Sequence, residues 1–164
     1  MKPRCAVLLI LAAGLFGAAQ AQPIQDASVD ELVQQLAPPK PATRGLRNLV
    51  PEKRQIDLVI NFDFDSSRLQ TSSQPLLEKL AEALGTERLQ VLRFKVEGHT
   101  DAKGSAAYNE ALSAKRAQAV LEFLQAHGVQ PGRLQAQGKG FAELLNPANP
   151  QAAENRRVRI STAD

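Results

Sequence analysis

One stretch constrains the fold of this chain more than any other: an alternating apolar run, a polar turn and then a long helical pattern. Leu92, Phe94 and Val96 alternate toward a glycine, as in a strand with one buried face. The tetrapeptide Gly98-His99-Thr100-Asp101 follows, and residues 105–127 then carry apolar residues at helical spacing. This order predicts a strand–helix unit whose connecting turn is polar.

Arg116 has an unfavourable position on the predicted helix. At about 100° per residue the apolar side chains gather in one stripe, and Arg116 falls inside it. The stripe consists of Tyr108, Leu112, Ala119, Val120 and Phe123. A guanidinium group on a core-facing surface is costly unless it meets an anion. The carboxylate of Asp101 is a candidate, either as a direct partner or through a ligand that carries both charges.

Residues 1–21 have the pattern of a cleaved secretory signal. Two basic residues precede an apolar run over residues 6–18, and Ala19-Gln20-Ala21 supplies a small-x-small cleavage site. The run is too short for a transmembrane helix, so we expect an exported mature chain without a membrane span. The only cysteine, Cys5, would leave with the signal, which excludes thiol catalysis, disulfides and cysteine metal sites.

Cleavage would also lower the charge. The full chain has 20 basic and 17 acidic residues, and 18 basic residues remain when Lys2 and Arg4 are removed. A mature net charge of +1 and an aromatic content of 4% argue against a nucleic-acid surface.

Residues 22–54 are predicted to be a proline-containing tether with one short amphipathic helix. Ser28 and Glu31 have the spacing of a capping box. The apolar face of the helix consists of Val29, Leu32, Val33 and Leu36. Because a helix this short is marginal alone, two interpretations stay open. The segment is a plain spacer, or its apolar face docks on the domain or on a partner.

Residues 55–164 are predicted to form one domain of the α/β class. The patterns indicate strands over residues 56–64, 89–98, 133–140 and 155–161, helices over 75–85 and 105–127, and a loop or short helical turn over 141–150. In the first strand, we expect Phe62 and Phe64 to continue the buried face of Ile56, Leu58 and Ile60. Strand–helix–strand units with right-handed crossovers predict a mixed sheet of about four strands, with helices packed on one face as an α+β sandwich.

The last strand contains three arginines in an informative order. Val158 and Ile160 point to one side, and Arg157 and Arg159 to the other. Arg156 therefore shares the apolar side at the strand end, and we expect it to need an anion there.

Together these residues resemble the peptidoglycan-binding C-terminal domain of the OmpA family. The matching pieces are Phe62-Asp63-Phe64-Asp65-Ser66, Gly98-His99-Thr100-Asp101, Tyr108-Asn109 with Leu112-Ser113-x-x-Arg116-Ala117, Arg133-Leu134 with Gly138-x-Gly140, and Asn155-Arg156-Arg157-Val158. No single piece is specific, but five in this order are a strong match. The resemblance implies the OmpA-like β-α-β-α-β-β fold over the proposed domain.

The resemblance also implies non-covalent binding of the peptidoglycan stem peptide, chiefly through diaminopimelate, whose side chain ends in an ammonium and a carboxylate. By the family pattern, Asp101 takes the ammonium and Arg116 takes the carboxylate. Further residues that match polar contacts or flank the same pocket are Thr100, Asn109, Arg156 and Asp65. The implied setting is the periplasm, at the cell wall and peripheral to the outer membrane, with peptidoglycan and an envelope protein as partners and no cofactor.

Other interpretations stay open from the sequence. Asp101 and Arg116 could form a structural salt bridge that pins the turn to the helix. His99 has one histidine companion in the chain, which favours a structural role over a metal ligand or general base. A peptidoglycan-cleaving enzyme is disfavoured, because Arg116 would keep Asp101 ionised and no nucleophile or zinc set is evident. A third hypothesis is an envelope assembly protein that acts through the helix at residues 29–36.

Overall fold

The computed structural model describes residues 22–39 and 53–163. The predicted signal, residues 40–52 and the last residue lie outside the described part. The strands are β1 (Gln55–Leu58), β2 (Phe94–Gly98), β3 (Leu134–Gly138) and β4 (Val158–Thr162); the helices are α1 (Val29–Leu36), α2 (Gln74–Gly85) and α3 (Ala106–Ala126); short 3₁₀ turns are η1 (Thr71–Ser73) and η2 (Ala153–Asn155). All strands are shorter than the sequence pattern indicated. Residues 141–150 form a loop with turns, as expected, and η2 follows this loop.

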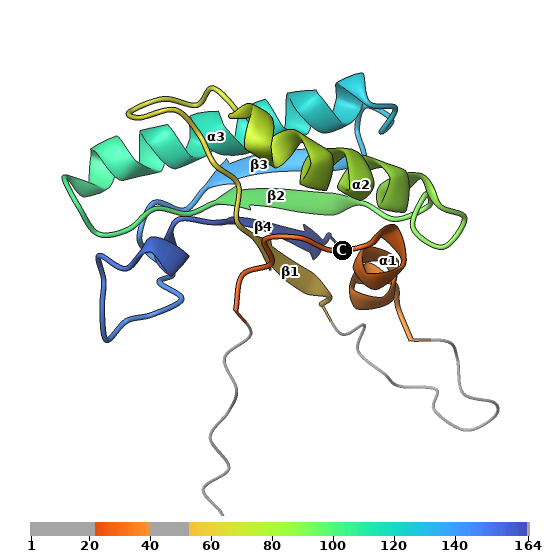
Figure 1. The fold of residues 1–164 in the computed structure, drawn as a ribbon, viewed down its shortest axis with the longest axis horizontal. Helices are drawn as coiled ribbons and strands as arrows, with labels where there is room; N and C mark the ends of the chain where they lie inside the picture. Colours follow the sequence, from red (N-terminus) through yellow and green to blue (C-terminus); the bar gives the residue numbers. More distant parts are fainter. Residues whose placement is uncertain (1–21, 40–52, 164) are drawn as a thin grey trace, which may run out of the picture.

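The four strands form one sheet in the order β1-β4-β2-β3. β2 and β3 are parallel and are connected through α3, whereas β4 is antiparallel to both of its neighbours. α2 and α3 lie together on one face of the sheet (Figure 1). The predicted mixed sheet with helices on one face is confirmed.

The hydrophobic core lies between this face of the sheet and the helices. Only the first three residues of the buried face expected for the first predicted strand contribute buried side chains to it. Ile56, Leu58 and Ile60 are buried as expected. Phe64 was wrongly assigned to the same face, because its side chain is 99% exposed. β1 ends at Leu58, and an isolated bridge between Phe62 and Leu69 closes a separate loop, so strand alternation does not continue to Phe64.

α1 docks on the domain, which decides between the two interpretations of this segment. Leu32 and Leu36 are fully buried in the same core as α2 and the sheet. Ahead of the helix, the backbone NH of Ile24 donates to the Asp57 carbonyl (2.7 Å), and the Val59 NH donates to the Ile24 carbonyl (2.8 Å). The described part of the predicted tether therefore belongs to the domain, and it covers part of the β1 edge.

α3 lies closer to the sheet than the predicted apolar stripe would allow. A Cβ atom on Gly98 would lie 2.2 Å from the Ser113 carbonyl oxygen, and one on Gly138 would lie 2.7 Å from the Ser113 hydroxyl oxygen. Such a close approach needs small or polar residues on the inner face. The buried residues of α3 are Asn109, Ser113, Ala117, Val120, Leu121 and Leu124. The predicted stripe was wrong in its first half, since Tyr108 is 47% exposed and Arg116 lies half-buried at the edge of the inner face. In its second half Val120 is buried and Phe123 packs against the core, as expected.

Candidate functional site

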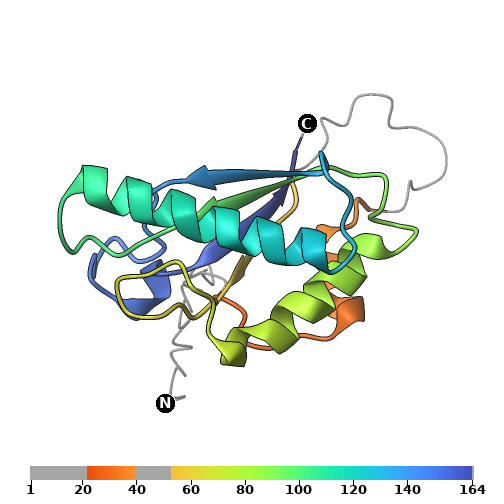
Figure 2. The same ribbon diagram turned by 90° about the horizontal axis from the view of Figure 1, so that it is seen from above.

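All six residues that were predicted to bind a ligand line one groove. The groove has a volume of about 510 Å³, which is comparable with that of a small-ligand pocket. Four segments contribute to it: the loop after β1, the turn after β2, the first half of α3 and Arg156 ahead of β4. Figure 2 shows the segment around residues 60–70 (yellow) beside α3. The six residues are Asp65, Thr100, Asp101, Asn109, Arg116 and Arg156.

Asp101 is buried, and both of its carboxylate oxygens are engaged. Oδ1 accepts a hydrogen bond from the backbone NH of Lys103 (3.1 Å), and Oδ2 accepts one from the guanidinium of Arg156 (2.8 Å). The structure therefore pairs Asp101 with Arg156 and not with Arg116. Arg156 does meet an anion, but the inward orientation expected for it was wrong. Its side chain is 47% exposed, because it precedes β4 and lies at the edge of the groove.

Arg116 is held in place without a carboxylate partner. Its Nε donates to the Ser66 carbonyl (3.0 Å), and its guanidinium carbon lies 4.9 Å from the centre of the Phe62 ring. Burial, followed by the positive charge of Arg156, lowers the pKa of Arg116, but an arginine remains protonated at neutral pH. Within the described residues Arg116 makes no ion pair. Its positive charge therefore faces the groove without direct neutralisation.

The turn between β2 and α3 is fixed from both sides. The Thr100 NH donates to the Gly140 carbonyl (2.8 Å), and the Asn109 amide donates to the carbonyls of Lys103 (2.6 Å) and Ser105 (3.1 Å). The Asn109 amide nitrogen thus has a structural role in this state. The hydroxyl of Thr100 is buried and has no partner within the described residues, and such a group costs about 1–3 kcal/mol. A ligand or a water molecule in the groove would satisfy it.

Sequence reasoning placed the charged residues in the groove but missed the aromatic ones. Phe62 supports the Arg116 guanidinium, and Phe64 and Tyr108 line the same groove. The Tyr108 hydroxyl donates to the carboxylate of Asp65, which ties the loop to α3. A signal was present, because these aromatic residues lie within the motifs that carried the family resemblance.

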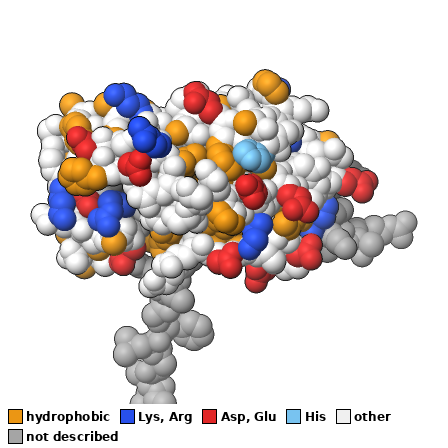
Figure 3. Space-filling view, turned by 45° about the horizontal axis from the view of Figure 1, so that its top comes forward, with side chains coloured by type: hydrophobic (Ala, Val, Ile, Leu, Met, Phe, Trp, Pro, Cys, Tyr) orange, Lys and Arg blue, Asp and Glu red, His pale blue; other side chains and the backbone are white. Residues whose placement is uncertain are grey.

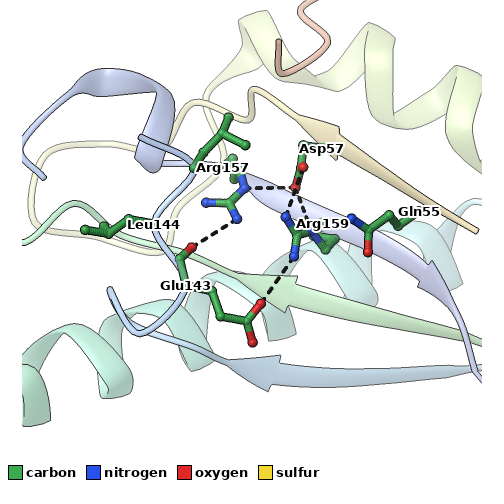
Figure 4. Close-up of a pocket in the computed structure, with 7 residues that line it drawn as sticks. Gln55, Asp57, Glu143, Leu144, Arg157 and Arg159 are labelled. Atoms are coloured by element: carbon green, nitrogen blue, oxygen red, sulfur yellow. Dashed lines mark hydrogen bonds and ion pairs between the residues drawn. The ribbon is translucent and has the colours of Figure 1, made fainter. Parts of the chain in front are cut away.

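A second cavity, of about 410 Å³, lies on the face of the sheet opposite to the helices (Figure 4). Asp57 accepts hydrogen bonds from Arg157 (2.9 Å) and Arg159 (2.9 and 3.1 Å). Glu143 completes the network, with its carbonyl accepting from Arg157 (3.1 Å) and its carboxylate from Arg159 (3.2 Å). Burial would raise the pKa of Asp57, but the two arginines outweigh it and hold that pKa below its usual value. Since the charges are already paired, we assign this cluster a structural role.

His99 lies beside this network and is buried. Neither ring nitrogen has a hydrogen-bond partner within the described residues. Burial, followed by the positive charges of Arg157 and Arg159, lowers the pKa of His99 to about 3, so the ring is neutral near pH 7. The described residues contain no cluster of three or more histidine, cysteine, aspartate or glutamate side chains suited to a metal ion. The structure thus gives His99 no metal-binding companions there.

Two surface properties bear on other classes of partner. On the face seen in Figure 3, acidic and basic side chains are interspersed, so this face presents no extended basic surface for nucleic acid. Among the described residues, no helix combines the length and the apolar character needed to cross a membrane.

Comparison with known proteins identifies the family. The OmpA family model matches residues 61–158, which is more than half of the chain. The chain belongs to the OmpA family. Among curated proteins it is 35% identical over 132 residues to photosystem I P700 chlorophyll a apoprotein A2 of Gloeobacter violaceus, covering 74% of this chain and 14% of that protein. It is 37% identical over 112 residues to outer membrane porin F of Pseudomonas aeruginosa, covering 66% of this chain and 31% of that protein. This OmpA-family chain thus spans less than a third of the length of either relative.

Solved structures of the OmpA-like type share the fold. The peptidoglycan-associated lipoprotein from Burkholderia pseudomallei is 30% identical, with a TM-score of 0.53 over 63% of this chain and 86% of that one. The cell wall anchor of the T6SS from Pseudomonas aeruginosa is 26% identical, with a TM-score of 0.55 over 81% of this chain and 90% of that one. The groove described above therefore lies within a domain of the OmpA type.

Proposed function

We propose that the groove binds the stem peptide of peptidoglycan through the zwitterionic end of a diaminopimelate side chain. The observation that carries this proposal is the presence of Asp101 and Arg116 in one groove. Asp101 supplies a buried carboxylate for the ammonium, and Arg116 supplies a guanidinium without a carboxylate partner in the described structure. An arginine–carboxylate contact is strong and directional.

The remaining groove residues have compatible roles. The Thr100 hydroxyl, which has no partner within the described residues, can hydrogen-bond to the ligand. Asn109 holds the turn that carries Thr100 and Asp101. Arg156 stays on Asp101 and keeps the carboxylate in position, while Asp65 contributes through its bond to Tyr108. The groove thus combines a ligand-facing charge pair with a rigid support.

The proposed biological role is non-covalent attachment to the cell wall in the periplasm, of this protein or of an envelope protein bound to it. The names of two solved relatives, one peptidoglycan-associated and one a cell wall anchor, support this role. Recruitment of a partner through the apolar face of α1 is not proposed, because Leu32 and Leu36 are already buried against the domain.

The experiment is a pull-down of purified mature protein on isolated peptidoglycan. We expect the wild type to be retained without release of soluble muropeptides, and Asp101→Ala and Arg116→Ala to be lost while circular dichroism remains unchanged. Lys115→Ala is the matched control, since Lys115 is exposed and adjacent to Arg116 on α3. Unchanged retention of both groove variants would contradict the site, and release of muropeptides would indicate an enzyme.

A further inference from the structure

Two of the three large hydrophobic side chains exposed in the described residues lie at the same groove. Phe64 is 99% exposed and Tyr108 is 47% exposed, and both line the groove, whereas the third, Val91, does not. Single exposed apolar residues are common on proteins and need no explanation. Here, however, two exposed aromatic side chains lie together at the same charged groove. We call Phe64 and Tyr108 the aromatic rim.

The backbone conformation of Asp65 and its hydrogen bond to Tyr108 fix the position of this aromatic rim. Asp65 has a φ of 51°, and it is the one non-glycine residue with positive φ in the part of the chain that the structure describes. Its carboxylate accepts the hydrogen bond of Tyr108, which joins the Phe64 loop to α3. Aspartate tolerates this left-handed conformation better than most residues do. The loop that carries the solvent-exposed Phe64 is thus fixed to α3 through the residue that follows Phe64.

A zwitterionic ligand end explains the charged floor of the groove but not its aromatic rim. Phe62 already supports the Arg116 guanidinium from within, so Phe64 is not needed for that contact. An aromatic ring with nearly all of its surface in water can bury a broad and flat C–H surface on ligand binding, and burial of such area is favourable. The C–H face of a pyranose ring matches an aromatic ring in size, whereas a single methyl group covers only part of it.

We infer that Phe64 and Tyr108 form a second subsite, which binds the C–H face of a sugar ring in the glycan strand that carries the stem peptide. This inference rests on the proposed function. The sugar is within reach, because only a few residues, roughly 10 Å of extended chain, separate diaminopimelate from the glycan. The groove would then bind the stem peptide and the sugar together. It would bind stem peptides that are still attached to the glycan more tightly than free ones.

The test compares two soluble ligands, a disaccharide-bearing muropeptide and the same stem peptide without sugar. Binding is measured by calorimetry and by tyrosine fluorescence, since Tyr108 is the only tyrosine and the chain has no tryptophan. We expect the wild type to bind the muropeptide about fivefold more tightly than the free peptide. Phe64→Ala should remove this preference, so that the ratio of its affinities for the two ligands falls to about one. Phe64→Tyr should retain the preference, and Val91→Ala is the control for loss of an exposed apolar side chain elsewhere.

The possible results distinguish failure of the sugar subsite from failure of the proposed stem-peptide binding. An equal loss of affinity for both ligands in Phe64→Ala, or a wild type without preference, would overturn the sugar subsite while leaving the peptide site intact. Failure of the wild type to bind either ligand would overturn both proposals. Because Phe64 is almost fully exposed, its replacement should not change the unfolding transition, and this is checked by urea denaturation.

Discussion

Asp101 and Arg156 form an ion pair of 2.8 Å although they lie 55 positions apart in the chain. The pair joins the turn after β2 to the segment before β4. It occupies the carboxylate that the sequence left open as a direct partner of Arg116. Arg116 is therefore left with carbonyl and aromatic contacts only in the described structure. A ligand that brings its own carboxylate would complete this arrangement, whereas a simple cation would not.

Replacement of Arg116 by lysine should weaken binding of the stem peptide about tenfold, although the positive charge is kept. Lysine cannot form the planar two-pronged contact with a carboxylate, and it loses the Nε bond to Ser66. Titration of wild type, Arg116→Lys and Lys115→Ala with soluble stem peptide measures the effect. Wild-type affinity in Arg116→Lys would show that charge alone is sufficient.

His99 should make stability fall as the pH is lowered from roughly 6.5 to 5. Its pKa of about 3 in the folded protein lies below the ordinary value of 6.5, so in this window the unfolded state binds a proton that the folded state excludes. The loss approaches about 1.4 kcal/mol for each pH unit. Asp57 and Glu143, whose pKa values are lowered, lose their stabilisation only at lower pH.

Urea unfolding of His99→Gln at several pH values checks this prediction. The variant should show a flatter dependence of the free energy of unfolding on pH than the wild type. His127→Gln serves as the control, because His127 is exposed at the end of α3. A variant with the wild-type slope would contradict the assignment of the slope to His99.

Gly98→Ala should destabilise the domain by about 3 kcal/mol or more. The added methyl group would lie 2.2 Å from the backbone carbonyl of Ser113, which cannot move without shifting α3. Gly85→Ala is the matched control, since a methyl group there would meet nothing within 4 Å. Thermal unfolding of both variants measures the difference, and equal melting temperatures would show that α3 is not packed this closely.

Leu32→Ala should lower the free energy of unfolding of the whole domain by about 2–5 kcal/mol. Leu32 is fully buried in the shared core, so its truncation leaves a cavity between α1 and the domain. Gln34→Ala, on the exposed side of the same helix, should have little effect. If the two variants unfolded alike, α1 would be a tether that the domain does not need.

Much of the fold could be predicted because its patterns are local. The capping box at Ser28 and Glu31, Pro75 in the first turn of α2, and Gly128 after α3 each act within one or two helical turns. Strand ends were predicted less well. Residues 89–91 belong to a turn after α2, in which the backbone NH groups of Leu89 and Gln90 donate to the Thr86 carbonyl, and β2 begins only at Phe94.

The sequence by itself determined the order of helices and strands and the identity of the charged residues that meet in the groove. Only the tertiary structure decided which charges pair, because the Asp101–Arg156 contact depends on how the ends of β2 and β4 are juxtaposed. It also decided the orientation of α3, since the close approach at Gly98 turns Ser113 inward and leaves Arg116 at the edge. Helical periodicity cannot predict the distance between α3 and the sheet. A helix that packs against the backbone of glycine residues does not need large apolar side chains on its inner face.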